Sequence, residues 1–179
     1  MLFRSTKPPE RLVFLERLDP EQAVNRDNPR RFFLEMNHMQ PTINGRTFNM
    51  SEVAPDEMVR LGTTELWEFV NTGGMMAMPH PMHIHGLSFQ VIGRFGGPGY
   101  RFLDKGWKDS VLVMPGERVA VIMRFLDHKG LYLYHCHNLE HEDLGMMRNY
   151  LVSSLSREKR TTRSEEHTSE LKSPSAKSY

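Results

Sequence analysis

Short apolar runs alternate with turn residues from about residue 31 to residue 152. The runs include RFFLEM, ELWEFVN, LSFQVIGRF, SVLVMPGERVAVIMRF and LYLYHCH, and the turns include INGRTF, Gly73-Gly74 and Pro115-Gly116. Runs of this length, rich in β-branched and aromatic residues, predict strands, and little amphipathic helix lies between them. The pattern therefore predicts an all-β domain, either an antiparallel sandwich or a barrel.

The pattern is weaker at both ends of the chain. Residues 1–30 are charged and proline-punctuated, so we interpret them as a linker or edge segment from a preceding domain. Residues 31–155 form the predicted domain. Residues 156–179 are polar and serine-rich, which predicts disorder. Their string RSEEHTSELKSP resembles translated sequencing-adapter sequence, so we treat this tail, with His167, as artefactual.

Composition narrows the possible partners. A length of 179 residues suits one domain, and a net charge of +1 gives no reason to expect nucleic acid or an anionic membrane as partner. No apolar run approaches the roughly 20 residues that a membrane span needs. The N-terminus lacks a secretory signal, and a single cysteine cannot form an internal disulfide, so the compartment stays open. Nine histidines and thirteen methionines suggest metal chemistry.

The single cysteine lies between two histidines in LYHCHNLEHEDLGMM, residues 133–147. Successive side chains of a strand face opposite sides, so His135 and His137 share one face while Cys136 points to the other. One segment can therefore serve two sites, one with imidazoles and one with a thiolate.

A second histidine cluster, HPMHIHG at residues 80–86, shows the same alternation. His83 and His85 share a face, and His80 has the opposite parity. Pairing the two clusters gives two ligand sets. The first contains His80, Cys136 and His141, with Met146 as a candidate axial ligand. The second contains His83, His85, His135 and His137.

The two sets favour different metals. Two imidazoles, a thiolate and a distant thioether are the ligands of a blue-copper electron-transfer site. Four imidazoles suit copper, zinc or iron. Spacing favours Met146 over Met147, and a methionine at the end of the motif favours copper over zinc. Three other interpretations of Cys136 remain: a buried structural residue, a catalytic thiol and a zinc ligand.

The motifs HPMHIHG and HCHNLEHEDLGMM resemble the third and fourth copper-binding motifs of multicopper oxidases, particularly bacterial laccase-like, copper-efflux and bilirubin oxidases. INGRTFNM, LWEFVN and GWKDSV resemble the strands around those motifs, so the match covers about Arg31 to Val152. The resemblance implies a cupredoxin (plastocyanin-like) domain with a Greek-key β-sandwich or barrel, the last domain of a longer chain. It also implies a periplasmic or secreted location.

The resemblance further implies a role for each ligand. His80, Cys136, His141 and Met146 would hold a type 1 copper. His83 would be a type 2 ligand, and His85, His135 and His137 would serve the type 3 pair. Glu142 would deliver protons to bound dioxygen. Electrons from a phenol-like or bilirubin-like reductant, or from Cu(I), would pass through Cys136 and its neighbours to a trinuclear cluster that reduces O2 to water.

The chain departs from the family pattern in one respect. The trinuclear cluster needs four more histidines, which the family supplies as two His-X-His pairs from an N-terminal cupredoxin domain. Outside the motifs the chain has only His38, His128 and His167, none in such a pair. We therefore expect a truncated oxidase, incomplete alone. The alternatives are a stand-alone blue-copper electron carrier without oxidase activity and a nonfunctional fragment.

Two further features carry weaker predictions. Asp109, in GWKDSV, is expected either to orient a copper-ligating histidine through a hydrogen bond or to serve as a turn or strand-end residue. The methionines from Met75 to Met78 favour filling an irregular gap over contacting Cu(I) or lining a substrate entrance.

Overall fold

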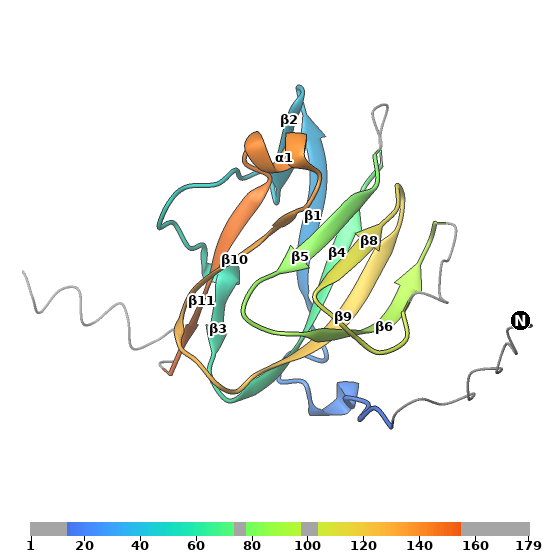
Figure 1. Cartoon of the computed structure of the whole chain (residues 1–179), viewed down its shortest axis with the longest axis vertical. Helices are drawn as coiled ribbons and strands as arrows, with labels where there is room; N and C mark the ends of the chain where they lie inside the picture. Colours follow the sequence, from blue (N-terminus) through green and yellow to red (C-terminus); the bar gives the residue numbers. More distant parts are fainter. Residues whose placement is uncertain (1–13, 74–77, 98–103, 155–179) are drawn as a thin grey trace, which may run out of the picture.

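A computed structural model describes residues 14–73, 78–97 and 104–154 of the chain (Figure 1). Within these ranges the strands form two sheets that face each other. The first sheet has the order β2-β1-β4-β9-β6-β7. Its strands are β2 (Gln40–Ile43), β1 (Arg30–Asn37), β4 (Thr63–Asn71), β9 (Arg118–Phe125), β6 (Phe89–Phe95) and β7 (Trp107–Lys108).

The second sheet has the order β3-β11-β10-β5-β8. Its strands are β3 (Met58–Arg60), β11 (Met147–Ser153), β10 (Gly130–Cys136), β5 (His80–Ile84) and β8 (Ser110–Val113). Helical structure in the described ranges is limited to α1 (Leu139–Asp143) and two 3-10 turns at Pro20–Gln22 and Pro55–Glu57. The predicted all-β sandwich is confirmed.

Two strand pairs depart from the antiparallel arrangement that the pattern predicts. β1 pairs with β4 in parallel, and β11 pairs with β3 in parallel. Between β1 and β4 the chain makes β2 in the same sheet, crosses to form β3 in the other sheet, and then returns. Such a crossover permits parallel neighbours, whereas the length of an apolar run carries no information on strand direction.

Aromatic rings hold the two sheets together. The Phe32 and Trp67 rings on the first sheet lie 4.8 Å apart, centroid to centroid, and Phe32 lies equally close to Tyr134 on the second. The Tyr150 ring meets Trp67 edge-on at 5.5 Å. All four side chains are almost fully buried. Because Tyr134 is on β10, this packing fixes the strand that carries Cys136.

A buried ionic group also anchors β10 and β11. Glu57 accepts hydrogen bonds from Arg148 Nε at 2.7 Å, from Arg148 Nη2 at 2.8 Å and from the Tyr134 hydroxyl at 2.9 Å. The carboxylate also accepts one from the Ala54 backbone N–H at 2.6 Å. Burial and the negative charge of Glu57 raise the pKa of Tyr134. The charge pair is therefore satisfied inside the fold, as a buried ion pair must be.

The segment before β1 packs on the outside of the first sheet. Leu18 and Ala23 are buried against Leu66 of β4 and Ile122 of β9. The interpretation of residues 1–30 as a linker or edge segment stays a prediction. Met75, Met76 and the tail with His167 lie outside the described residues, and the described Met78 is partly exposed. In the described ranges, the structure contains no helix with the length and apolar character of a membrane span.

Candidate metal centres

Strands β5 and β10 bring the two histidine motifs side by side. They pair antiparallel, with His83 opposite His135 and Met82 opposite Cys136. The burial of β5 alternates along its length, with His80 buried and His83 only partly buried. The two motifs therefore present one set of side chains to the interior and another set to the outer face, as strand parity predicts.

The interior set consists of His80, Cys136 and His141. The Cys136 Sγ lies 3.5 Å from His80 Nδ1 and 3.6 Å from His141 Nδ1. All three residues are buried, and their donor atoms lie within 4.8 Å of one another. A metal ion held roughly 2.0–2.3 Å from nitrogen and sulfur donors places those donors about 3.5 Å apart. The spacing therefore fits donors that share one ion.

Burial keeps these donors uncharged. It lowers the pKa of His80 to about 4, with a further contribution from the nearby His141, and it lowers the pKa of His141. Burial also raises the pKa of the Cys136 thiol to about 11. A thiol of this kind is a poor nucleophile at neutral pH, because the reactive thiolate is scarce. These values disfavour a catalytic thiol and leave both imidazoles free to bind metal.

Met146 lies beside this interior set. Its backbone carbonyl accepts a hydrogen bond from the Cys136 N–H at 3.0 Å, and its own N–H donates to the His141 carbonyl at 2.8 Å. Met146 is fully buried in the main core cluster, whereas Met147 is partly exposed. The backbone thus ties Met146 to two members of the set.

The outer set gathers four imidazoles. His83, His85 and His135 have ring nitrogens within 4.8 Å of one another. The Nε2 atoms of His85 and His135 lie 3.1 Å apart. The His137 ring centroid lies 5.0 Å from that of His135 and 5.4 Å from that of His83. Two nitrogens bound to one ion at roughly 2.0–2.1 Å would lie about 3 Å apart, which matches the His85–His135 spacing.

Hydrogen bonds set the orientation of the outer rings. His83 Nδ1 lies 2.8 Å from the Asp109 carbonyl oxygen and 3.0 Å from Ser110 Oγ. His135 Nδ1 lies 3.2 Å from the Cys136 carbonyl oxygen. An Nδ1–H that donates to a carbonyl leaves Nε2 as the free ligand atom. Burial is the largest cause of the lowered pKa of both His85 and His135, so neutral rings are favoured there too.

Asp109 does orient a histidine, but its main-chain carbonyl makes the contact. Sequence reasoning considered Asp109 and missed Ser110, whose hydroxyl also lies beside His83. Ser110 faces His83 across the β5–β8 pair, and that partnership follows from sheet order. The sequence around Ser110 does not indicate this contact, because a serine at the start of an apolar run has no distinguishing pattern.

Glu142 lies between the two histidines that flank the cysteine. Its Oε2 is 3.5 Å from His135 Nδ1 and 3.9 Å from His137 Nδ1. The side chain is partly exposed, so one carboxylate connects the outer set with solvent. His38 and His128 lie in the β1–β2 and β9–β10 connections, and neither joins a metal-binding group among the described residues.

The model of the multicopper oxidase family matches residues 19–156. The chain belongs to the multicopper oxidase family. A laccase from Haloferax volcanii is 43% identical over 116 residues, which cover 63% of this chain and 19% of that protein. A bilirubin oxidase from Albifimbria verrucaria is 36% identical over 131 residues, covering 72% and 23% respectively.

The crystal structure of the multicopper oxidase McoA from Aquifex aeolicus superposes with a TM-score of 0.68 and is 38% identical. The match covers 81% of this chain and 32% of that one, and it confirms the predicted cupredoxin-like fold. This multicopper oxidase chain spans about a fifth to a third of the length of these three relatives.

Copper fits the interior set of this multicopper oxidase chain. The family implies copper, and a soft thiolate with two imidazoles is a donor combination that copper binds well. Sulfur–nitrogen spacings of 3.5 and 3.6 Å allow one ion to be shared without movement of the strands. His80, Cys136 and His141 thus form a possible type 1 copper site.

Proposed function

We propose that this chain is the last cupredoxin domain of a multicopper oxidase. In this proposal the interior set, with Met146 as axial ligand, holds a type 1 copper. The outer set of His83, His85, His135 and His137 supplies half of a trinuclear copper cluster. One observation carries the proposal. The Cys136 thiol lies in one donor group with His80 and His141, while the imidazole of its neighbour His135 lies in a second group with His83 and His85.

Copper at these positions would supply one-electron oxidation of a reducing molecule at the first set and reduction of dioxygen to water at the second. The family names of the relatives, laccase and bilirubin oxidase, support a phenol-like or bilirubin-like reductant, and Cu(I) is a further candidate. In this proposal the activity belongs to a longer assembly, in which another domain supplies the remaining histidines.

Cys136 links the two sets through covalent bonds. Its side chain reaches the interior set, and one peptide unit on each side leads to His135 and His137. Its side chain is fully buried, and His80 and His141 are nearly so, so water has little access to the thiolate. The segment His135–His137 therefore offers a short through-bond route between the two sets, with Cys136 and His135 buried.

Glu142 is the proposed proton carrier. The distances of its carboxylate to the two flanking histidines put it beside the outer set, and its partial exposure lets it exchange protons with water. A carboxylate in this position could hold a proton at Oε2 and release it toward the second face of β10.

An N-terminal cupredoxin domain would complete the outer set. His85 is exposed, and about half of the His137 side chain is accessible. His135 is buried, so the accessible imidazoles are those of His85 and His137, and they are open to a partner that brings further histidines. Residues 31–155 would then be the terminal domain and residues 1–30 the segment leading into it.

Copper titration of the purified chain tests the first set. We expect an intense blue band with a narrow hyperfine splitting in the spin-resonance spectrum. Cys136→Ser should abolish both, whereas His83→Ala should retain them, because His83 belongs only to the outer set. A copper-loaded chain whose spectra do not change in Cys136→Ser would refute the type 1 assignment.

Oxygen consumption separates the oxidase from a stand-alone electron carrier, which the complete interior set would also permit. With a phenolic donor we expect no oxygen uptake by the chain alone. Uptake should begin when an N-terminal partner domain with two His-X-His pairs is co-produced, and His83→Ala should prevent it. A blue complex that consumes no oxygen in either state would favour the carrier.

A further inference from the structure

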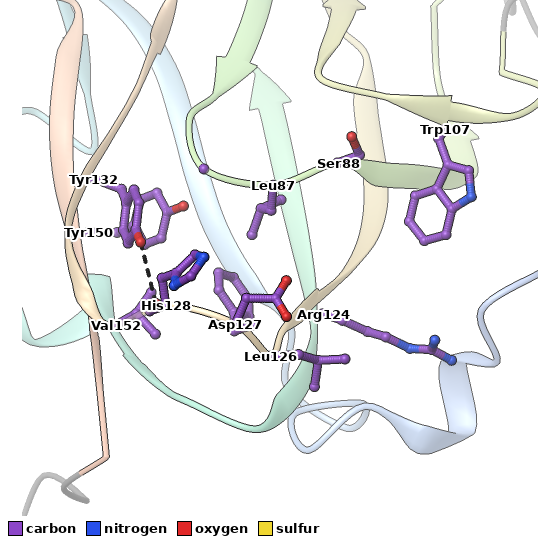
Figure 2. Close-up of a pocket in the computed structure, with 12 residues that line it drawn as sticks. Leu87, Ser88, Trp107, Arg124, Leu126, Asp127, His128, Tyr132, Tyr150 and Val152 are labelled. Atoms are coloured by element: carbon purple, nitrogen blue, oxygen red, sulfur yellow. Dashed lines mark hydrogen bonds between the residues drawn. The ribbon is translucent and has the colours of Figure 1, made fainter.

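A separate pocket lies at the end of β10 that is remote from Cys136. It has a volume of about 340 Å³ and is formed by the loop after β5 and the loop between β9 and β10 (Figure 2). Tyr132 lines it and is four residues from Cys136, which corresponds to about 13 Å along a strand. None of the metal-donor side chains lines this pocket. Its volume falls within the range of small-molecule sites.

One side of the pocket is an aromatic wall held by stacking and a hydrogen bond. The Tyr132 ring stacks on Tyr150 at 5.4 Å between centroids, with an angle of 23° between the ring planes. The Tyr150 hydroxyl donates a hydrogen bond to the His85 carbonyl at 2.5 Å, which fixes its ring. Trp107 lines the opposite side and is 38% exposed. Flat, preformed walls of this kind favour a flat aromatic ligand.

The charge of the pocket is uneven. Arg124 lines it, but its Nη2 donates to Glu16 Oε1 at 2.8 Å, so a carboxylate already neutralises that cation. Asp127 has no hydrogen-bond or ion-pair partner among the described residues. In Figure 2 its carboxylate lies between Leu87 and Leu126, within the ring of lining side chains. Asp127, which is exposed, is therefore the one carboxylate in the pocket lining, and the one lining cation, Arg124, pairs with Glu16 outside the lining.

We propose that this pocket binds a small aromatic amine, an arylalkylamine whose ring packs on Trp107 beside Leu87 while its ammonium group faces Asp127. The indole buries the ring, and the carboxylate attracts the cation. Lys129, the next cation along the loop, does not line the pocket. No metal-donor side chain takes part in this site, although Tyr150 and Gly86 connect its lining to the backbone of His85.

Fluorescence of the metal-free chain can test the proposal. Of the two tryptophans, Trp67 is fully buried in the core and Trp107 lines the pocket. The probes are 2-phenylethylamine, its neutral analogue 2-phenylethanol and the anion phenylacetate. We expect saturable quenching by the amine, with a dissociation constant roughly threefold or more below that of the alcohol. Phenylacetate should bind most weakly, and Trp107→Phe should remove the signal.

Two variants place the probe in the pocket. Asp127→Asn should bring the affinities for amine and alcohol to within about twofold of each other, because only the charge is lost. The matched control, Asp143→Asn, removes an exposed carboxylate on α1 and should keep the preference for the amine. Leu126→Phe enlarges an exposed lining side chain and should weaken binding of all three probes.

Three outcomes would overturn the proposal. The first is no saturable quenching by any probe. The second is equal binding of amine and alcohol to the unchanged chain. The third is a preference for the amine that survives in Asp127→Asn, since the selectivity would then arise elsewhere on the protein.

Discussion

Single side chains decide which metal chemistry this fold can support. Cys136 is a core residue and a donor at once, and it is fully buried among apolar neighbours. The same burial that raises its pKa to about 11 keeps it inert until a metal displaces its proton. The residue therefore behaves as an ordinary small hydrophobe in the metal-free chain and as a thiolate ligand in the loaded one.

Met146 gives a sharp test at this scale. Met146→Leu conserves volume and should cost less than about 1.5 kcal/mol of unfolding free energy, yet it removes the only thioether proposed as a ligand. We expect the blue band to persist with a shifted energy and a raised reduction potential, because the weak axial ligand tunes both. Visible spectroscopy and redox titration measure this. An unchanged potential would argue against Met146 as a ligand.

Ser110 offers a second test. Its hydroxyl lies 3.0 Å from His83 Nδ1. The Asp109 carbonyl, which also contacts Nδ1, is unchanged when Ser110 is replaced. Ser110→Ala should leave the blue band of the interior set untouched and weaken metal binding at the outer set by at most about tenfold. Copper titration followed separately by the two spectral signatures measures this. A tenfold loss at the interior set instead would contradict the proposed division into two sets.

At the residue scale, the features that could be predicted from the sequence are those that depend on the alternation of side chains along a strand. Alternation along HPMHIH and YHCH separates His80 and Cys136 from His83, His85 and His135, and the structure groups these donors in the same way. The contacts made by Asp109 and Ser110 could not be predicted, because they depend on which strand lies beside β5. Neighbour choice within a sheet is a long-range property, and no local pattern encodes it.

At the scale of the elements, the buried Glu57 group ties β10 and β11 together. Removing the hydroxyl in Tyr134→Phe should cost about 1 kcal/mol, because Arg148 still satisfies the carboxylate. Glu57→Gln leaves the buried guanidinium of Arg148 without its main counter-charge and should cost about 3–5 kcal/mol. Denaturant unfolding of the metal-free chain measures both. Equal costs would mean that the charge pair contributes little.

The turn after β5 provides an element-scale prediction with a matched control. Gly86 has φ +82°, and a Cβ there would lie 2.6 Å from the Tyr132 ring. Gly62 has φ +83°, with open space around the corresponding position. Gly62→Ala should therefore show only the backbone cost, about 1–2 kcal/mol. Gly86→Ala should exceed it by about 1 kcal/mol or more, because the ring must move.

Thermal unfolding compares the two glycine variants. If both variants lose the same unfolding free energy, the Tyr132 ring can move aside at no energetic cost, and the pocket wall is not rigid. A larger loss in Gly86→Ala would support the rigid aromatic wall on which the ligand pocket depends.

The elements themselves were only partly predictable. The long apolar runs gave β1, β4, β6, β8, β9 and β10, and turns were predicted correctly at Asn44-Gly45 and Pro115-Gly116. The short strands β3 and β7 and the helix α1 gave too little local periodicity to be recognised. The parallel pairs arose because the chain crosses between sheets, which depends on how the whole domain closes.

For the whole molecule, copper should stabilise the folded state. Because the donors converge only in the native fold, a ligand at 100 times its dissociation constant adds about 2.7 kcal/mol to the unfolding free energy. We expect a higher melting temperature for the copper-loaded chain and no comparable rise in Cys136→Ser. Calorimetry of both, with and without copper, measures this. A similar rise in the variant would point to the outer set as the dominant binding site.

The pairing of β5 with β10 has a consequence for the detection of misfolding. A slip of one residue in β10 would turn Cys136 away from His80 and His141 and His135 away from His83 and His85. Both donor sets would be lost together, and the copper-loaded protein would be colourless. Blue colour would then report the correct strand register of this domain, and colonies of a mutant library could be screened for folding by eye.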